Sequence, residues 1–223
     1  YTMDSAFTPA GAPVTVLSGL PLTGDHPMHP FVIDSAGQLF MDVGSKTNSC
    51  QVKNRTRKSP GINPCTELET RGGIWTYDAT RTGQTYSPAG RYATGIRNAV
   101  GMAFDPSGQL YSTMHGRDQL GDNWAGLYTP LQGADLPAEE LLEIKKGGDY
   151  GWPYCYFDST QKKLVLAPEY GGDGGKKVGV CDKKTEPAKY FPAHWAPDGL
   201  VFYNGAQFPA SYKGGAFIAF HGS

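Results

Sequence analysis

The sequence lacks an excess of charge of either sign, and this argues against two classes of partner. Among 223 residues, 20 are Lys or Arg and 21 are Asp or Glu, so the formal net charge is -1. Such a balance creates no field that would gather a phosphate backbone or an anionic lipid surface. We therefore expect neither a nucleic acid partner nor a membrane partner.

Long apolar runs are also missing. No run approaches the roughly 20 residues that a membrane-spanning helix needs. The chain starts at Tyr1 without the charged and then apolar segment that is typical of a secretion signal, which indicates a removed signal or a missing true start. Because 39% of the residues are hydrophobic, the chain can still bury a core and is expected to be globular.

Cysteine is scarce, and its spacing does not suit zinc. The four cysteines form no Cys-x-x-Cys pair and have no partnering histidines at zinc-finger spacing. Two local disulfides, Cys50 with Cys65 and Cys155 with Cys181, would each close a modest loop. That pairing predicts an oxidising compartment, periplasmic or extracellular, whereas four buried free thiols would suit a cytosolic protein.

Glycine and proline are plentiful, with 30 and 17 residues, and 13 Tyr and 10 Phe accompany them. This composition favours short strands joined by many turns. Three segments, residues 31–40, 102–111 and 200–218, read as β-hairpins. In the first two an Asp-x-x-Gly turn joins two apolar strands, since Asp can bond its own backbone and Gly accepts a positive φ.

The first two turns begin at Asp34 and Asp105, 71 residues apart, which is in the range of one four-stranded propeller blade with its loops. We therefore expect an all-β fold of β-propeller blades, about three of them, built as four-stranded antiparallel sheets with long loops. No linker divides the chain, so residues 1–223 are expected to form one partial propeller domain. Residues 48–71 and 158–194 are predicted to be loops, and residues 137–144 a short helical turn or the start of a strand.

Three ordered blocks carry a family resemblance: GIRNAVGMAFDPSGQLY (95–111), HGRD (115–118) and GGDYGWPYC (147–155). They resemble the soluble quinoprotein glucose/sorbosone dehydrogenase family. Residues 24–34 and 194–203 are similar to two further blocks of that family. The resemblance implies a six-bladed propeller, of which this chain would supply a part. Unpaired edges of an open ring would favour self-association, so a homo-oligomer is possible.

His26 is the catalytic residue that the resemblance implies. It would act as the general base, because an imidazole that titrates near neutrality suits removal of a hydroxyl proton. The structural alternative is a histidine that only caps a loop beside Pro27, and His29 is a weaker candidate. Where the family often has an Asp to orient the base, this chain has Ser45, whose hydroxyl can accept the imidazole N–H without adding charge.

The resemblance also implies the ligands of two cofactors. Arg97, Asn98 and His115 would bind pyrroloquinoline quinone (PQQ), whose carboxylates and quinone oxygens need cationic and hydrogen-bonding partners. Gly116 and Arg117 would offer backbone carbonyls to Ca²⁺ beside that quinone. Alternatively, Arg97 only ties two blades together, and the loop is an ordinary solvated turn.

The function implied is a PQQ- and calcium-dependent oxidation of an aldose or related sugar. Hydride would pass to the quinone, His26 would take the hydroxyl proton, and an unidentified electron acceptor would reoxidise the cofactor. Two alternatives stay open, since a propeller does not fix an activity. They are a non-catalytic propeller module that binds protein or carbohydrate, and a Ca²⁺-dependent lactonase.

Overall fold

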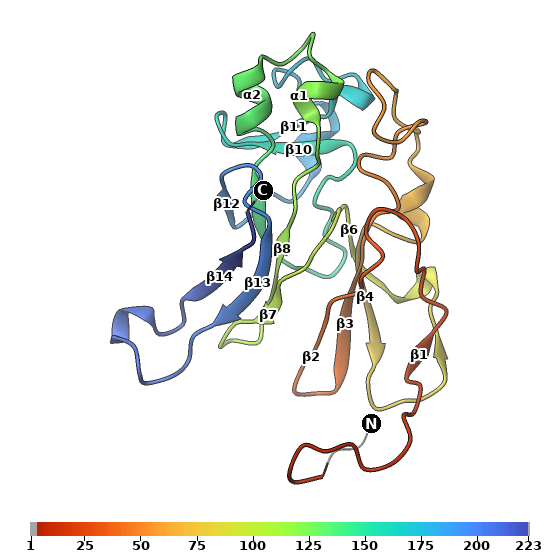
Figure 1. Cartoon of the computed structure of the whole chain (residues 1–223), viewed down its shortest axis with the longest axis vertical. Coiled ribbons are helices and arrows are strands. Elements are labelled where there is room, and N and C mark those ends of the chain that lie inside the picture. Colours follow the sequence, from red (N-terminus) through yellow and green to blue (C-terminus); the bar gives the residue numbers. More distant parts are fainter. Residues whose placement is uncertain (1–3, 223) are drawn as a thin grey trace.

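The computed structural model describes residues 4–222, and two four-stranded antiparallel sheets form its body (Figure 1). The first sheet consists, in spatial order, of β2 (Phe31–Ile33), β3 (Gln38–Val43), β4 (Gly73–Asp78) and β6 (Arg91–Thr94). The second consists of β7 (Met102–Phe104), β8 (Leu110–Met114), β9 (Glu139–Glu143) and β12 (Lys189–Phe191). A hairpin of β13 (Pro197–Phe202) and β14 (Ala216–Phe220) follows. The predicted all-β fold of propeller blades is confirmed.

Smaller elements decorate these sheets. The parallel pair of β1 (Leu17–Ser18) and β5 (Gln84–Thr85) lies beside the first sheet, and β10 (Cys155–Asp158) pairs with β11 (Lys163–Leu166). Two short helices, α1 (Leu120–Asn123) and α2 (Pro130–Asp135), lie at one end of the molecule (Figure 1). Single 3₁₀ turns are formed by Thr66–Glu69, Pro88–Gly90, Pro168–Tyr170, Gly179–Lys183 and Ala210–Tyr212.

The three predicted hairpins are present, and two close through the expected turn. The Oδ1 atom of Asp34 accepts backbone N–H groups at 2.9 and 2.8 Å, and that of Asp105 does so twice at 2.9 Å. Gly37 and Gly108 have φ values of 82° and 86°, in the left-handed region that a side chain disfavours. The Asp-x-x-Gly pattern therefore encodes these turns directly.

The strand order brings certain loops to one end of the molecule. The first strands of the sheets, β2, β7 and β13, lie side by side, as Figure 1 shows. Because neighbouring strands run antiparallel, the chain enters each first strand at the same end of the sheet where it leaves the second. Segments before β2, β7 and β13 and after β3 and β8 therefore gather at that end.

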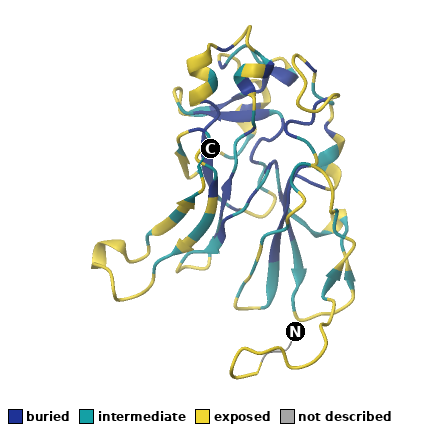
Figure 2. Cartoon of the chain, viewed as in Figure 1, coloured by how far each residue is buried: buried dark blue, intermediate teal, exposed yellow. Residues whose placement is uncertain are grey.

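The main core lies between the two four-stranded sheets, where Figure 2 shows buried residues along the strands and in the loops beyond their ends. Phe40 packs edge-on against Tyr92 and Phe104, with ring centres 5.0 and 5.7 Å apart. Burial of each large apolar side chain contributes about 1.5–3 kcal/mol. The buried members are Phe40, Ile74, Ala93, Ile96, Ala99, Met102, Leu110, Met114, Leu142, Ile144 and Tyr150.

The prediction that residues 158–194 form only loops is wrong. This range contains β11 and β12, and β12 is the outer strand of the second sheet, paired with β9. The sequence pattern hides β12 because it has three residues and two of them, Lys189 and Tyr190, are exposed. Residues 137–144 prove to hold a strand, β9, whereas residues 48–71 are irregular apart from one 3₁₀ turn.

Both predicted disulfides are present, Cys50–Cys65 and Cys155–Cys181, and they join residues 15 and 26 positions apart. The first anchors an irregular segment that no strand holds. Within residues 4–222, no helix has the length and apolar character needed to cross a bilayer.

We expect replacement of Cys50 and Cys65 by Ser to lower the free energy of unfolding by about 3 kcal/mol, since a closed loop of this length restricts the unfolded chain. Urea unfolding of the oxidised wild type and the double variant measures the difference. The Cys155→Ser/Cys181→Ser variant opens a longer loop of 26 residues and should lose a similar amount of free energy of unfolding. An unchanged midpoint in the first variant would contradict the expectation.

Candidate functional site

The gathered loops enclose a polar cavity of about 240 Å³. All six residues predicted to form the site line it: His26, Arg97, Asn98, His115, Gly116 and Arg117. Asp118, Pro137, Glu139, His194 and Ala196 complete the lining. The structure thus brings together residues from the segments before β2, before β7 and after β8, as the antiparallel order requires. Their chemical roles remain predictions.

The ring of His26 is held in one orientation by Ser45. Nδ1 of His26 lies 2.9 Å from the Oγ of Ser45 and 3.1 Å from its carbonyl oxygen. Ser45 Oγ donates its own hydrogen to the carbonyl of Thr47, so it must accept from the imidazole. Nδ1 therefore carries the hydrogen, and Nε2, which bonds no other described residue, keeps its lone pair for a ligand in the cavity.

Burial lowers the pKa of His26 to about 3, and the nearby positive charge of Arg97 acts in the same direction. The hydrogen bond that His26 donates to the carbonyl of Ser45 and the charges of Asp25 and Asp118 oppose this shift of the pKa only in part. The imidazole is consequently neutral at physiological pH. A neutral imidazole is the form that can accept a proton.

Arg97 is buried, with 3% of its surface exposed, and most of its hydrogen-bonding capacity is used within the protein. Nε and Nη2 donate to the carbonyl oxygen and Oδ1 of Asn48, at 3.1 and 2.9 Å. Nη2 also donates to Asp118 at 2.8 Å, and Nη1 to the carbonyl of Gly116 at 2.9 Å. Four of the five N–H groups are thus occupied, which leaves one on Nη1 for a ligand.

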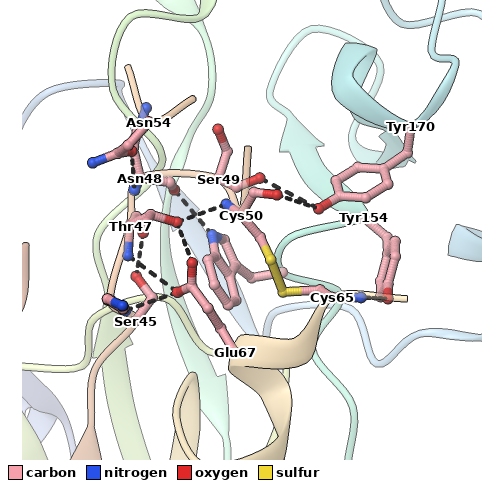
Figure 3. The surroundings of a disulfide bond; sticks show 12 residues. Ser45, Thr47, Asn48, Ser49, Cys50, Asn54, Cys65, Glu67, Tyr154 and Tyr170 are labelled. Atoms are coloured by element: carbon pink, nitrogen blue, oxygen red, sulfur yellow. Dashed lines mark hydrogen bonds between the residues drawn. A yellow bond between two sulfur atoms is a disulfide. The ribbon is translucent and has the colours of Figure 1, made fainter. Parts of the chain in front are cut away.

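Residues 45–50 connect the histidine with the arginine, and Figure 3 shows this segment beside its disulfide. Ser45 donates its backbone N–H to the carbonyl of Arg97 at 2.8 Å, in addition to holding His26. Glu67 accepts the backbone N–H groups of Lys46 and Thr47 at 2.8 and 3.1 Å. The segment is therefore fixed along its length and bonded to both predicted site residues.

Asn48 is the residue of this segment that the sequence interpretation missed. It is fully buried, and its Oδ1 accepts from Arg97 and from the backbone of Asp118. Its Nδ2 donates to the Asp118 carbonyl at 2.9 Å, and its own carbonyl accepts the indole N–H of Trp152 at 3.0 Å. Trp152 is accordingly a packing residue. Nothing in the local sequence around Asn48 marks it as part of a site.

Two of the predicted quinone ligands keep polar groups at the cavity. The side chain of Asn98 makes no hydrogen bond to another residue among those described, while its carbonyl accepts the backbone N–H of His115 at 3.0 Å. Nε2 of His115 lies 3.1 Å from Oδ1 of Asp198, in contact but without hydrogen-bond alignment. The amide of Asn98 is therefore available to a ligand that both donates and accepts.

The predicted calcium loop offers oxygen atoms, but only its backbone suits the role. The Arg117 side chain pairs with the buried Glu169, with Nη1 2.6 Å from Oε1. No cluster of three or more His, Cys, Asp or Glu side chains in residues 4–222 could hold a metal ion. The oxygen atoms nearest this role are the backbone carbonyls of Gly116 and Arg117, of which that of Gly116 already accepts from Arg97, and the carboxyl group of Glu139. This is hard-donor chemistry, which fits Ca²⁺.

Glu139 is a second residue that the sequence interpretation missed. Its Oε2 accepts the backbone N–H of Gly116 at 2.8 Å, and its Oε1 lies 3.4 Å from the N–H of Ala196. Burial raises the pKa of this carboxyl group, against the effect of the Gly116 hydrogen bond and of His115. The available sign was the Glu139-Glu140 pair directly before two leucines, because carboxyl groups at buried strand positions are unusual.

The comparisons with known proteins agree with this fold. The Glucose / Sorbosone dehydrogenase family model matches residues 16–220, which confirms the resemblance seen in the sequence blocks. An uncharacterised protein of Borreliella burgdorferi is 32% identical over 139 residues, a match that covers 59% of this chain and 30% of the relative.

Solved structures are similar at lower sequence identity. A carbohydrate-active enzyme of family AA12 from Trichoderma reesei, in an iodide structure, has a TM-score of 0.70 and 21% identity, over 93% of this chain and 51% of that one. The holo PQQ domain of pyranose dehydrogenase from Coprinopsis cinerea has a TM-score of 0.66 and 18% identity, over 90% and 51%. The soluble aldose sugar dehydrogenase of Escherichia coli, in its apo form, has a TM-score of 0.56 and 21% identity, over 89% of this chain and 49% of that one. The chain therefore spans about half the length of these structures, and the likeness concerns the fold.

The low pKa of His26 predicts a loss of stability in acid. Below about pH 6.5 the unfolded imidazole binds a proton, whereas the folded one resists until about pH 3. Stabilisation present above pH 6.5 is therefore lost as the pH falls toward 3. When the pH is lowered from 7 to 5, we expect the free energy of unfolding of His26→Gln to fall by roughly 1–2 kcal/mol less than that of the wild type. Urea unfolding at both pH values tests this, and equal losses would contradict it.

We expect Asn48→Ala to lower the free energy of unfolding by about 1–3 kcal/mol, because an Nη2 N–H of Arg97 and the backbone N–H of Asp118 lose the Oδ1 acceptor. The control is Asn204→Ala, at an exposed position without a side-chain hydrogen bond to any described residue, where a change within about 0.5 kcal/mol is expected. Chemical unfolding of the two variants gives the comparison. Equal midpoints would show that Asn48 does not support the site.

Proposed function

The chain belongs to the glucose/sorbosone dehydrogenase family, and on that basis we propose that its cavity is the sugar-oxidising site of a PQQ-dependent dehydrogenase. One observation carries the proposal. A neutral imidazole with an anchored Nδ1–H lines the same cavity of about 240 Å³ as a buried guanidinium and a side-chain amide. A base and charge-stabilising donors are what hydroxyl oxidation requires.

In this proposal His26 removes the proton of the sugar hydroxyl. Nε2 accepts it, while Ser45 keeps the Nδ1–H in place and so fixes the direction of the lone pair. Burial, and next to it the positive charge of Arg97, keep the base unprotonated before the reaction. The charge of Arg97 also favours release of the proton afterwards, since two adjacent positive charges repel.

Arg97 and Asn98 would bind the quinone, which when present supplies the hydride acceptor. The free amide of Asn98 and the remaining N–H of Arg97 suit carboxylate and carbonyl oxygens. An anionic ligand would also offset the charge of Arg97, and we expect this to raise the pKa of His26 from about 3 toward the range where it is an efficient base. Ligand binding and base strength are therefore coupled.

The carbonyls of Gly116 and Arg117 and the carboxylate of Glu139 would hold Ca²⁺, which supplies Lewis-acid polarisation when bound. A calcium structure exists for the similar Trichoderma reesei enzyme, which has a TM-score of 0.67. The Gly116 carbonyl already accepts from Arg97, but a carbonyl oxygen has a second lone pair. Glu139 would then bind as the anion despite its raised pKa, because a divalent cation favours the charged form.

We further propose a periplasmic or extracellular location, which the two disulfides support because such compartments are oxidising. The substrate would be an aldose or a related sugar, and a separate electron acceptor would complete the cycle. We also propose that the chain is one partial propeller domain and that its exposed strand edges allow self-association.

The protein supplied with PQQ and Ca²⁺ should reduce a dye in the presence of aldoses, and His26→Ala should lower kcat about 10²–10⁴-fold. His29→Ala is the matched control, because His29 does not line the cavity and bonds backbone carbonyls at 3.2 and 3.0 Å. It should keep activity within a few-fold of the wild type.

A spectral titration separates binding from chemistry. His26→Ala should still change the absorbance of added PQQ, whereas Arg97→Leu should not, because Arg97 and not His26 is assigned to the carboxylates. Wild-type turnover that survives in His26→Ala would overturn the base assignment. Absence of both a spectral change and turnover in the wild type would overturn the dehydrogenase proposal.

A further inference from the structure

One stretch of the chain has a charge composition unlike the rest. Residues 43–66 contain five basic residues and no Asp or Glu, although the whole chain has nearly equal numbers of each sign. The basic residues are Lys46, Lys53, Arg55, Arg57 and Lys58. Four of them fall within residues 52–59, here called the basic loop. The proposed reaction uses no side chain of this loop.

The basic loop is rigidly held although it contains no strand or helix. The Cys50–Cys65 disulfide closes its base, and the N–H of Val52 donates to the carbonyl of Pro60 at 2.9 Å. Lys53 donates its backbone N–H to Ser59 Oγ at 2.9 Å, and Lys58 donates to the carbonyl of Asn123 at 3.1 Å. Its charged side chains are therefore presented from a fixed backbone.

The loop lies at the rim of the proposed active site. Arg55 contacts Asp25, the neighbour of His26, at 2.9 Å, and also Asp118 at 2.9 Å. The same Oδ2 of Asp118 lies 2.8 Å from Nη2 of Arg97 inside the cavity. Only one carboxylate thus separates a loop residue from the guanidinium assigned to the cofactor.

A second cavity joins the loop to the site from another side. It has a volume of about 540 Å³ and is lined by Arg57, by residues of both helices and by His194, which also lines the cavity of His26. Asp122 is the acidic residue of that lining, so it tempers the charge near Arg57. The charge of the loop that no acidic side chain offsets is therefore that of Lys53 and Lys58, which are both exposed.

These cations are available to a partner. Arg55 is neutralised by its two aspartates, but Lys53, Arg57 and Lys58 are exposed and form no ion pair with any residue in the described range 4–222. Exposed side chains of one sign on a rigid surface steer oppositely charged molecules toward it.

We propose that the basic loop is the docking surface for an acidic electron-accepting protein. The inference rests on the proposed dehydrogenase function, because each sugar oxidised releases two electrons and two protons. Two ferric haem centres of such a partner would each accept one electron and become ferrous, and the protons would pass to solvent. A surface beside the cavity places the acceptor close to where those electrons appear.

The arrangement fits a protein better than a small anion. Lys53, Arg57 and Lys58 do not share a pocket with one another: Arg57 lines the cavity of about 540 Å³, and Lys53 and Lys58 line neither of the two cavities described above. A small anion needs donors that point at one place, whereas an acidic protein face contacts several dispersed cations together.

The test uses two acceptors that differ only in charge: a basic cytochrome c, and the same cytochrome after its lysines are succinylated. With PQQ, Ca²⁺ and saturating sugar, kcat/KM for the succinylated acceptor should exceed that for the basic one at low salt. Lys53→Glu/Lys58→Glu should lower the value for the succinylated form about tenfold or more. The advantage of the succinylated over the basic acceptor in kcat/KM should shrink as ionic strength rises.

The matched control is Arg81→Glu/Lys213→Glu, which makes the same change in net charge. These residues follow β4 and lie between β13 and β14, so they sit at the end of the molecule opposite α1 and α2 (Figure 1). Both variants are compared at an ionic strength of about 0.1 M, where the control should stay within about twofold of the wild type because charges farther apart than a Debye length of about 10 Å are screened. Equal losses in both variants would overturn the proposal.

A binding measurement without turnover separates this inference from the dehydrogenase proposal. Calorimetric titration of the protein with succinylated cytochrome c should detect binding that Lys53→Glu/Lys58→Glu weakens about tenfold and that the control keeps. Binding lost only in the loop variant supports the surface even if no sugar is oxidised. Binding that neither variant changes, or tighter binding of the basic cytochrome, would refute it.

Discussion

Burial of the Arg97 guanidinium is the constraint on which the site depends. A charge removed from water must be paired and its donors satisfied, or it destabilises the fold by several kcal/mol. Asn48, Gly116 and Asp118 provide four acceptors from two separate segments of the chain, residues 45–50 and residues 115–118. Each of these segments is thereby drawn to the same point, and the cavity is the space that remains between them.

The segment of residues 45–50 transmits this constraint to the base. Ser45 holds both the imidazole of His26 and the backbone of Arg97, while Asn48 holds the guanidinium. A disulfide closes the segment at Cys50, and Glu67 anchors its backbone at the other end. A histidine and an arginine 71 residues apart in sequence are therefore positioned by one short piece of chain.

A row of alternating negative and positive side chains leads from the surface to the buried Arg97 beside His26. Asp25, Arg55, Asp118 and Arg97 follow one another at contact distances of 2.8 to 2.9 Å, from the surface to the buried interior. Burial acts to raise the pKa of Asp118, but Arg97 and Arg55 prevail and lower it, so this carboxylate stays charged. The base in the same cavity is kept neutral. One pocket thus contains a fixed positive charge and an uncharged proton acceptor, a combination suited to chemistry in which an anion develops.

Sequence alone determined the parts of this protein that depend on local rules. The Asp-x-x-Gly turns, the hairpins, the paired cysteines and the blocks that carry His26 and Arg97 are short-range patterns, because a turn or a motif is encoded by residues next to one another. Only the tertiary structure decided the roles of Asn48 and Glu139 and the membership of β12 in its sheet. Their partners are distant in sequence, and a hydrogen bond to a buried guanidinium or an edge strand of three residues leaves no periodic signal. Folding supplies that information, since a buried polar group is satisfied by whichever residues the packing of the blades brings within reach.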